Sequence, residues 1–280
     1  MRSYYRISDK SYPKDKLIGA DKRTCLLNFL DTFRSEIKII ADRCEGKTLD
    51  WLHDLKVDIV ETDFGNAGSL HYAMDLAIKE CSDDDLIYFC EDDYLHQSKS
   101  KQLLQEGQQI SDYLTLYDHP DKYTNLYELG EVSKVVRTQQ SHWRYTISTC
   151  MTFAVNCKIL KEDIEIFKKH VGIVDDKKEH PVDHEIFCEL KEKGRKLAVC
   201  IPGTACHTDL TFSGMTGVVL IEPWAIEMMI VKLDQELEFM RKKIKEKEEF
   251  DVMKNQILSK YNGWKKLVGM DALLKSCPES

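Results

Sequence analysis

The sequence predicts an α/β fold, with a mostly parallel central sheet that carries helices on both faces. Three observations in the first hundred residues support this prediction. Short β-branched or aromatic runs alternate with segments whose apolar residues recur at helical spacing, and the connections between them are short. A buried run, 86–90 (LIYFC), ends directly in three acidic residues. Such alternation is typical of a parallel sheet because neighbouring parallel strands need a crossover connection, usually a helix.

The first half is predicted to hold four strands, which are separated by three helices. The expected strands are 4–8, 37–41, 57–61 and 86–90. The expected helices are 22–34, 48–55 and a longer one that begins in the turn residues near 65. In the first of these helices, Leu26, Leu30 and Phe33 fall on one face, which we expect to pack on the sheet.

The second half is predicted to be less regular. Its expected elements are a polar helix over 98–116, a loop over 118–125, two or three strands within 134–156, a helix over 158–169, a polar loop up to Pro181, a helix over 184–194 and a strand over 196–202. Glycines in 170–182 and 208–217 predict two lids over a ligand site. They are Gly172, Gly214 and Gly217.

The tail from Glu222 onward is predicted to be helical. Its apolar residues alternate in steps of four and three, which is the seam of a coiled coil over nearly three heptads. They are Ile226, Ile230, Leu233, Leu237, Met240 and Ile244. We expect two domains, 1–221 and 222–280, the first divided into halves at 97/98. The seam is expected either to form a homodimer or to pack back on the first domain.

Composition narrows the class of protein. A hydrophobic content of 42% and a charged content of 31% are ordinary for a soluble globular protein. The formal net charge of −8 argues against nucleic acid as the main partner, since phosphate backbones attract basic surfaces. No apolar run approaches the ~20 residues of a membrane span, and the first residues lack a signal-peptide core, so a cytoplasmic location is expected.

The ten cysteines show neither a CxxC pair nor the spacing of a zinc finger. Cys90 and Cys200 lie inside expected strands, where a free thiol acts as a small apolar group. We therefore expect reduced, buried thiols.

Glu91, Asp92 and Asp93 follow the buried strand 86–90 without a break. Three adjacent carboxylates repel one another, so a cation would stabilise them there. Mg²⁺ and Mn²⁺ take oxygen ligands and leave coordination positions for substrate phosphates. Open α/β sheets bind ligands at the carboxyl edge, which is where this cluster is expected. The alternative is a solvated turn in which Asp92 or Asp93 caps a following helix.

Three segments, in this order and at this spacing, resemble the nucleotide-sugar glycosyltransferases of the GT-A fold, most closely the family-2-like group. They are 39–48 (IIADRCEGKT), 65–78 (GNAGSLHYAMDLAI) and 85–96 (DLIYFCEDDYLH). The last is similar to the acid-bearing DxD strand of that family, except that its first position is Glu91. The resemblance covers residues 1 to about 210, and small enzymes of this kind occur in bacteria and in large DNA viruses.

The resemblance implies a donor-binding site in the first half. Asp42 would accept a hydrogen bond from the imide of a uracil base, and Arg6, Ile7 and Ser8 would flank the base and the ribose. Asn66 and Gly68 would let the backbone approach the nucleotide, since glycine has no Cβ. Asp92 would bind the ribose or a metal-bound water, and Asp93 would coordinate Mn²⁺ or Mg²⁺. Whether Glu91 is a ligand or holds a water stays open.

The second half supplies further candidates by the same resemblance. His207 would be an additional metal ligand, with a surface-loop histidine as the alternative. Asp183 would be the catalytic base, with Glu185 and the weaker Asp209 as alternatives, and it could instead be the N-cap of the following helix. Trp143 could stack on a sugar, although an aromatic residue in a strand is more often part of the core.

His142 and Arg144, on either side of Trp143, could bind hydroxyl or phosphate groups. The activity implied is metal-dependent, inverting transfer of a sugar from a nucleotide sugar, with UDP favoured, to a hydroxyl of a glycan or another acceptor. One alternative is a sugar-phosphate nucleotidyltransferase, which usually carries a glycine-rich loop with Lys or Arg after strand one. The other is a catalytically degenerate module that assembles through its C-terminal helix.

Overall fold

The structure is a computed structural model that describes residues 1–11, 16–17, 19–34, 36–119, 122, 133–174, 177–209, 254–255 and 259. The chain divides into two compact units, Met1–Gly217 and Val218–Ser280. The predicted seam over 226–244, the glycines of the second predicted lid and the predicted boundary at 221/222 lie outside the described residues. Among the helices that are described, none combines the length and the apolar character that a membrane span requires.

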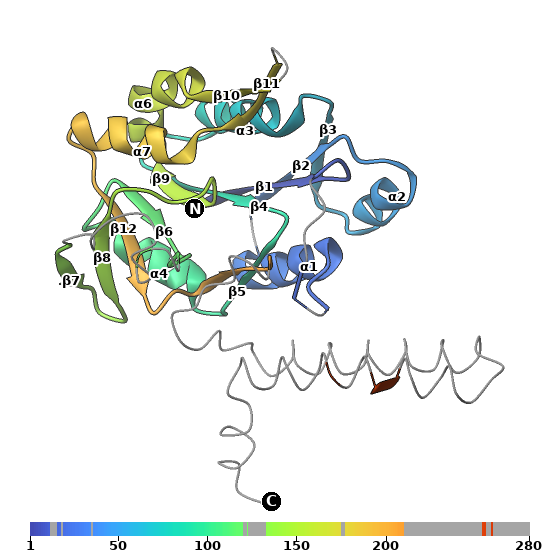
Figure 1. Cartoon of the computed structure of the whole chain (residues 1–280), viewed down its shortest axis with the longest axis horizontal. Helices are drawn as coiled ribbons and strands as arrows, with labels where there is room; N and C mark the ends of the chain where they lie inside the picture. The colour runs from blue at the N-terminus through green and yellow to red at the C-terminus, as the bar shows by residue number, and fades with distance from the viewer. Residues whose placement is uncertain are drawn as a thin grey trace, which may run out of the picture. The chain divides into compact units, whose positions relative to one another are not determined.

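A nine-stranded sheet forms the centre of the first unit, in the order β3-β2-β1-β4-β9-β6-β12-β8-β7 (Figure 1). Its first half consists of β1 (Arg2–Ser8), β2 (Ile37–Asp42), β3 (Asp58–Thr62) and β4 (Leu86–Glu91). All neighbours within this half are parallel, because α-helices form the crossovers between them. The order 3-2-1-4 places a switch point between β1 and β4, where doubly wound sheets bind ligands.

The second half of the sheet is mixed. It consists of β9 (Phe153–Asn156), β6 (Tyr113–Thr115), β12 (Leu197–Ile201), β8 (His142–Thr146) and β7 (Val135–Arg137). Strand β9 runs antiparallel to β4 and β6, and β8 runs antiparallel to β12 and β7. Because β6 and β12 are parallel, β8 and β9 are the two strands of the nine-stranded sheet that run opposite to the rest. The predicted fold class, α/β with a mostly parallel sheet between helices, is therefore confirmed.

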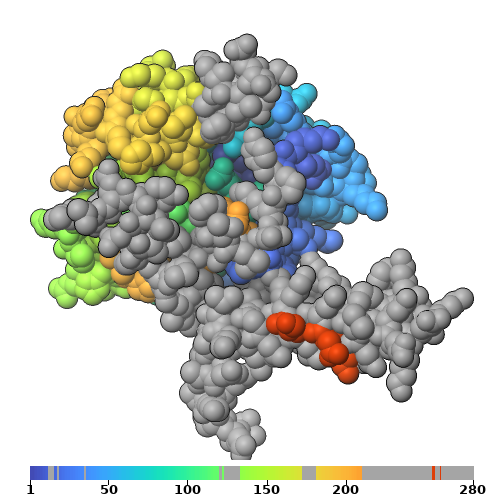
Figure 2. Space-filling view, viewed as in Figure 1, coloured from blue at the N-terminus to red at the C-terminus, as the bar shows by residue number. Residues whose placement is uncertain are grey.

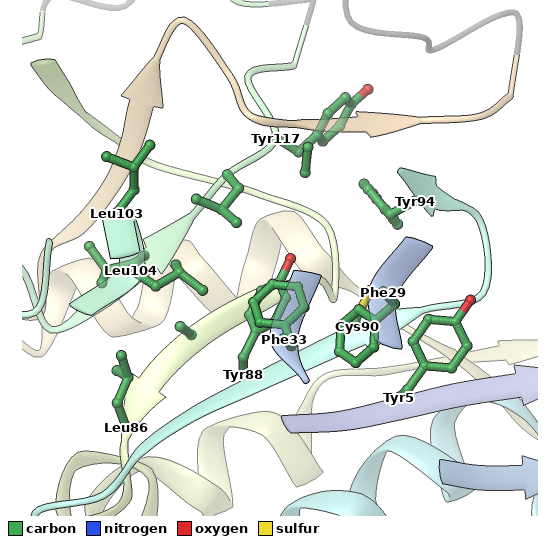
Figure 3. Close-up of a cluster of buried hydrophobic side chains, with 14 of the residues drawn as sticks. Tyr5, Phe29, Phe33, Leu86, Tyr88, Cys90, Tyr94, Leu103, Leu104 and Tyr117 are labelled. Carbon is green, nitrogen blue, oxygen red and sulfur yellow. The ribbon is translucent and has the colours of Figure 1, made fainter. Parts of the chain in front are cut away.

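Helices cover both faces of the sheet (Figure 1). On one face lie α1 (Lys22–Phe33), α2 (Gly46–Asp54) and α4 (Ser100–Gly107), and on the other lie α3 (Gly65–Glu80), α6 (Cys157–Lys169) and α7 (Asp183–Glu192). Phe33 of α1 packs on Tyr88 of β4, with ring centroids 5.0 Å apart (Figure 3). On the opposite face, Phe153 of β9 lies 5.5 Å from Phe167 and 5.6 Å from Phe187. Aromatic side chains therefore pack between the helices and the sheet on both faces.

Two predicted elements of the second half are wrong. The helix expected over 98–116 ends at Gly107, and residues 113–115 form β6 because they fill the position between β9 and β12. A Cβ at Gly107 would lie 2.8 Å from Leu114, so the helix ends where it contacts this strand. The polar loop expected up to Pro181 is a hairpin of β10 (Val171–Val174) and β11 (Lys177–Pro181). The short run 171–174, which contains two valines and an isoleucine, pairs with the charged strand 177–181, so this segment forms strands although its composition is polar.

The acid cluster is followed by a strand and not directly by a helix. Strand β5 (Tyr94–His96) pairs antiparallel with β13 (Ala205–His207), and α4 begins only at Ser100. Asp92 and Asp93 therefore do not cap a helix, which removes the alternative interpretation of this cluster. The buried thiols predicted for Cys90 and Cys200 are present.

Candidate functional site

The candidate site lies at the carboxyl ends of β1 and β4, at the switch point of the sheet. Ser8 is the last residue of β1, and β4 ends at Glu91. Arg6 and Glu91 are register partners on these two parallel strands. The two strands therefore deliver the first candidate residues and the acid cluster to the same edge of the sheet.

Asp93 and His207 form a buried pair. Pairing of β5 with β13 aligns Tyr94 with His207, and the Thr208 amide donates to the Asp93 carbonyl over 2.8 Å. As a result, His207 Nε2 lies 3.2 Å from Asp93 Oδ2. The imidazole packs edge-on against the Tyr94 ring at 5.0 Å. Within the described part of the chain, its Nδ1 is buried and makes no hydrogen bond.

Strand β5 is held in place by Asn28 of α1. The Asn28 side-chain amide donates to the His96 carbonyl over 2.9 Å, and its Oδ1 accepts from the His96 amide over 2.6 Å. The His96 ring is also buried, and burial lowers its pKa to about 3, so it is neutral beside the Tyr88 hydroxyl at 2.7 Å. The turn that carries Asp92 and Asp93 is thus fixed on its C-terminal side.

Asp92 is buried between strand β1 and helix α1. Its Oδ2 accepts from the Ser8 amide over 3.1 Å and lies 3.1 Å from Lys22 Nζ. Burial raises the pKa of the Asp92 carboxyl, and the charge of Lys22 opposes that rise. The sequence reasoning missed Lys22. A lysine at the first residue of the helix after strand one was the available signal, because that helix begins near the edge where strand one ends.

Arg6 connects three elements of the site. Its Nη2 donates to Glu91 Oε1 over 2.8 Å, and its Nη1 donates to the carbonyl and the Oδ1 of Asn66 over 2.7 and 2.9 Å. The guanidinium therefore ties β1 and β4 to the first turn of α3. Glu91 is the ion-pair partner of Arg6. Ile7, by contrast, points into the core with 1% of its surface exposed, so its side chain does not line the site.

Asp42 accepts hydrogen bonds from its own chain at the end of β2. Its Oδ1 accepts from the Thr62 hydroxyl over 2.9 Å and the Phe64 amide over 2.7 Å, and its Oδ2 accepts from the Gly65 amide over 3.0 Å. Within the described part of the chain, these bonds use three of the about four acceptor positions of the carboxylate, and Asp42 is only 2% exposed. Phe64 lies directly beside Gly68: a Cβ atom added at Gly68 would be 2.7 Å from the Cβ of Phe64.

Asp183 is the first residue of α7 and lies close to the acid cluster. Burial and, to a smaller extent, the negative charge of Glu91 raise the pKa of its carboxyl to about 8, and the charge of Arg6 opposes that rise. The N-cap of α7 is Val182, which makes no side-chain capping bond, so the helix-cap alternative for Asp183 is wrong. Burial raises the pKa of the Cys150 thiol, and the negative charges of Asp183 and Glu91 raise it further, so Cys150 lies near these two carboxyl groups.

The remaining candidates lie elsewhere. Glu185 is exposed and faces His170 at 3.6 Å. Asp209 is buried, and its backbone forms a bridge with Lys16. Trp143 is fully buried, and its indole donates to Thr138 over 3.1 Å, so it is a core residue that cannot stack on a sugar.

Beside Trp143, the guanidinium of Arg144 forms an ion pair with the buried Asp118 at 2.8 Å. His142 is exposed. These two side chains thus differ in their surroundings, although both flank the same tryptophan.

The side chains suit a metal ion that shares its coordination with a ligand. Among the described residues, no cluster of three or more His, Cys, Asp or Glu side chains is arranged to hold a metal ion. Asp93 and His207 supply two groups, a carboxylate oxygen and the imidazole Nε2, which lie 3.2 Å apart. Mg²⁺ usually binds through one or two carboxylates and completes its shell with water and substrate phosphates. The pair fits such a partial site.

No protein-family model matches this sequence, and no curated protein does. Solved structures similar in fold include GalNAc-T7 with UDP, GalNAc and Mn²⁺ (12% identity, TM-score 0.47), covering 74% of this chain and 42% of that one. Staphylococcus aureus TarS shares 15% identity at a TM-score of 0.40, covering 71% and 58%. A Methanothermobacter nucleotidyl transferase shares 12% at 0.40, covering 71% and 85%. Similarities this distant assign no activity to the chain.

Proposed function

We propose that the protein transfers a sugar from a nucleoside-diphosphate sugar to a hydroxyl group of a glycan or another acceptor, with Mn²⁺ or Mg²⁺ as cofactor. One observation carries the proposal. The carboxyl edge of the sheet brings the buried Asp93–His207 pair to the same acid cluster as Asp183, a carboxyl group with a raised pKa. Uridine is the proposed base of the donor, on the family resemblance around Asp42.

In this proposal, Asp93 and His207 hold the cation. A divalent cation supplies charge neutralisation to the diphosphate that leaves the sugar. Asp92 and the backbone at Ser8 contact the ribose, and Arg6 fixes the edge of the sheet by holding Glu91 and Asn66. These residues were proposed from the sequence, and their arrangement at one edge of the sheet supports the proposal.

Asp183 acts as the base in the proposed reaction. Its carboxylate takes the proton of the acceptor hydroxyl while that oxygen attacks the anomeric carbon. The bond to the nucleoside diphosphate breaks, and the diphosphate leaves with the bonding electrons. A raised pKa makes the ionised Asp183 a stronger base than an ordinary carboxylate, and general base catalysis of this kind contributes about 10²–10⁴-fold to the rate. Attack opposite the leaving group inverts the anomeric centre.

A sugar-phosphate nucleotidyltransferase is the second candidate function. Two lysines of the segment after β1 favour this function. Lys22 Nζ lies 3.1 Å from Asp92 Oδ2, and the positive charge of Lys16 lowers the pKa of the same carboxyl group. Such enzymes release pyrophosphate, whereas a glycosyltransferase releases a nucleoside diphosphate. A non-enzymatic assembly role depends on the C-terminal seam, which lies outside the described residues.

Product analysis separates these functions. The full chain would be incubated with Mn²⁺ and a panel of nucleotide sugars, with water as the acceptor, and separately with nucleoside triphosphates and sugar 1-phosphates. We expect release of a nucleoside diphosphate that falls about 100-fold or more in Asp183→Asn. The matched variant Glu185→Gln removes a nearby exposed carboxylate of the same helix and should keep the rate. Pyrophosphate release would favour nucleotidyl transfer instead, and no product from either mixture would overturn the transferase proposal.

A further inference from the structure

Lys22 stands at the start of α1, facing the end of β1. The helix begins there because the Asp21 side chain accepts from the Thr24 amide over 2.8 Å. Lys22 Nζ donates to the Ser8 carbonyl and to Ser11 Oγ at 2.7 Å, and it lies 3.1 Å from Asp92 Oδ2. An ammonium group has three donors, and here each has a partner.

The charges around Lys22 explain why a cation stands at this position. Asp92 is a buried carboxylate, and a buried charge is tolerated only when it is paired. The Arg6 guanidinium is directed at Glu91 and Asn66, on the α3 side of β1, whereas Lys22 approaches from α1. Lys16 adds a second positive charge, because its charge also lowers the pKa of Asp92. The segment after β1 thus places two positively charged side chains near Asp92.

A diphosphate would meet repulsion from the acid cluster unless cations offset it. We propose that Lys22 binds the distal phosphate of the nucleoside diphosphate, an inference that rests on the proposed function. Ser11 is the partner that the ammonium gives up, since the Ser11 hydroxyl is exposed and water replaces the lost bond. The contacts with Ser8 and Asp92 keep the amine at the end of β1. There it stabilises the negative charge of the departing diphosphate.

Three variants isolate this role. Lys22→Met removes the charge but keeps an apolar stem of similar length, and Lys22→Arg keeps the charge. Lys10→Met is the matched control, because Lys10 lies in the same segment but pairs with the exposed Glu45 at 2.7 Å, with 54% of its side chain exposed. All three should keep the far-UV circular dichroism of the parent protein.

The test is calorimetric titration of the full chain, in Mn²⁺, with five nucleoside diphosphates (uridine, guanosine, thymidine, cytidine and adenosine) and the monophosphate of whichever binds best. We expect Lys22→Met to weaken binding of that diphosphate about 10- to 100-fold, the strength of one charged hydrogen bond. Binding of the monophosphate should change less than about threefold, and Lys10→Met should leave both within about twofold because exposed charges are screened. Lys22→Arg should retain most of the affinity.

Other results of the titration would show that the inference about Lys22 is wrong, or that the proposed function is wrong as well. The inference is wrong if Lys22→Met binds the diphosphate as tightly as the parent protein does, or if it loses affinity for the diphosphate and the monophosphate equally. In either case Lys22 has only a structural role, and the proposed function stands. If none of the five diphosphates binds the parent protein at millimolar concentration, the proposed function and the inference are both wrong.

Discussion

At the scale of single residues, the chemistry of the site depends on what surrounds each carboxyl group. Burial and the charge of Glu91 raise the pKa of Asp183, while Arg6 opposes the rise. The family resemblance predicted Asp183 as a candidate base, because it precedes a helix at the place where members of that family often carry their base. The raised pKa could not be predicted, because Arg6, Glu91 and Asp183 come from three distant segments that meet only in the fold.

The first prediction concerns Glu91→Gln. A base with a pKa of about 8 is mostly protonated at pH 7, so kcat/KM should rise with pH and level off above about pH 8. Removing the negative charge of Glu91 lowers the pKa of Asp183, because that charge raises it in the parent protein. The rise in kcat/KM should therefore move to lower pH, as measured by donor turnover between pH 5 and 9.

A suitable control for this prediction is Glu36→Gln. It removes the same charge from a residue that pairs with the N-terminus and Arg2, at the opposite end of β1. The pH profile of this variant should match that of the parent. A profile that does not move in Glu91→Gln, or that moves equally in both variants, would contradict the assignment of Asp183 as the titrating base.

At the scale of secondary-structure elements, two short strands bring together Asp93 and His207, the two residues that we propose hold a cation. Pairing of β5 with β13 brings His207 to Asp93 across more than a hundred residues. The sequence predicted His207 by resemblance but not these strands, since three-residue segments carry no periodic signal. Likewise, β6 was predicted as helix because the polar residues before it continue the helical pattern. The long alternating elements from β1 to β4 were predicted correctly, since their periodicity is local.

The second prediction tests how β5 is held. Asn28→Ala removes both side-chain bonds to the backbone of His96, and it leaves these buried polar groups with fewer partners. The free energy of unfolding should fall by about 1–3 kcal/mol, as measured by urea denaturation. Asp31→Ala on the same helix removes only an exposed contact with Arg34 and should cost less than about 1 kcal/mol. Equal losses in the two variants would show that Asn28 does not fix β5.

At the scale of the whole chain, the candidate site combines residues from both halves of the first unit. Figure 2 shows the blue-to-cyan residues of the first half on one side and the yellow-to-orange residues of the second half on the other. The first half supplies Arg6, Lys22 and the acid cluster, and the second half supplies Asp183 and His207. The family resemblance predicted Arg6, the acid cluster, Asp183 and His207 as candidate site residues. Lys22 could not be predicted from the sequence, because its proposed role rests on the short distance between its Nζ and Asp92 Oδ2.

The third prediction concerns a chain that ends at residue 221. All described residues of the site lie before residue 210, so the shortened chain should bind the same nucleotide with the same affinity as the full chain. The predicted heptad seam should make the full chain dimeric and the shortened one monomeric, as light scattering after size exclusion would show. An insoluble shortened chain would contradict this and indicate that the extension packs on the domain.

The central claim is that Asp93 and His207 hold a cation that binds a nucleotide at the carboxyl edge of the sheet. The most direct measurement is the unfolding midpoint with nucleoside diphosphates, with and without Mn²⁺, in the parent protein, Asp93→Asn and His207→Gln. A ligand at 100 times its Kd stabilises the folded state by about 2.7 kcal/mol. We expect one class of nucleotide to raise the midpoint only with Mn²⁺, and both variants to lose that rise. Equal midpoints with and without nucleotide in the parent protein would contradict the claim.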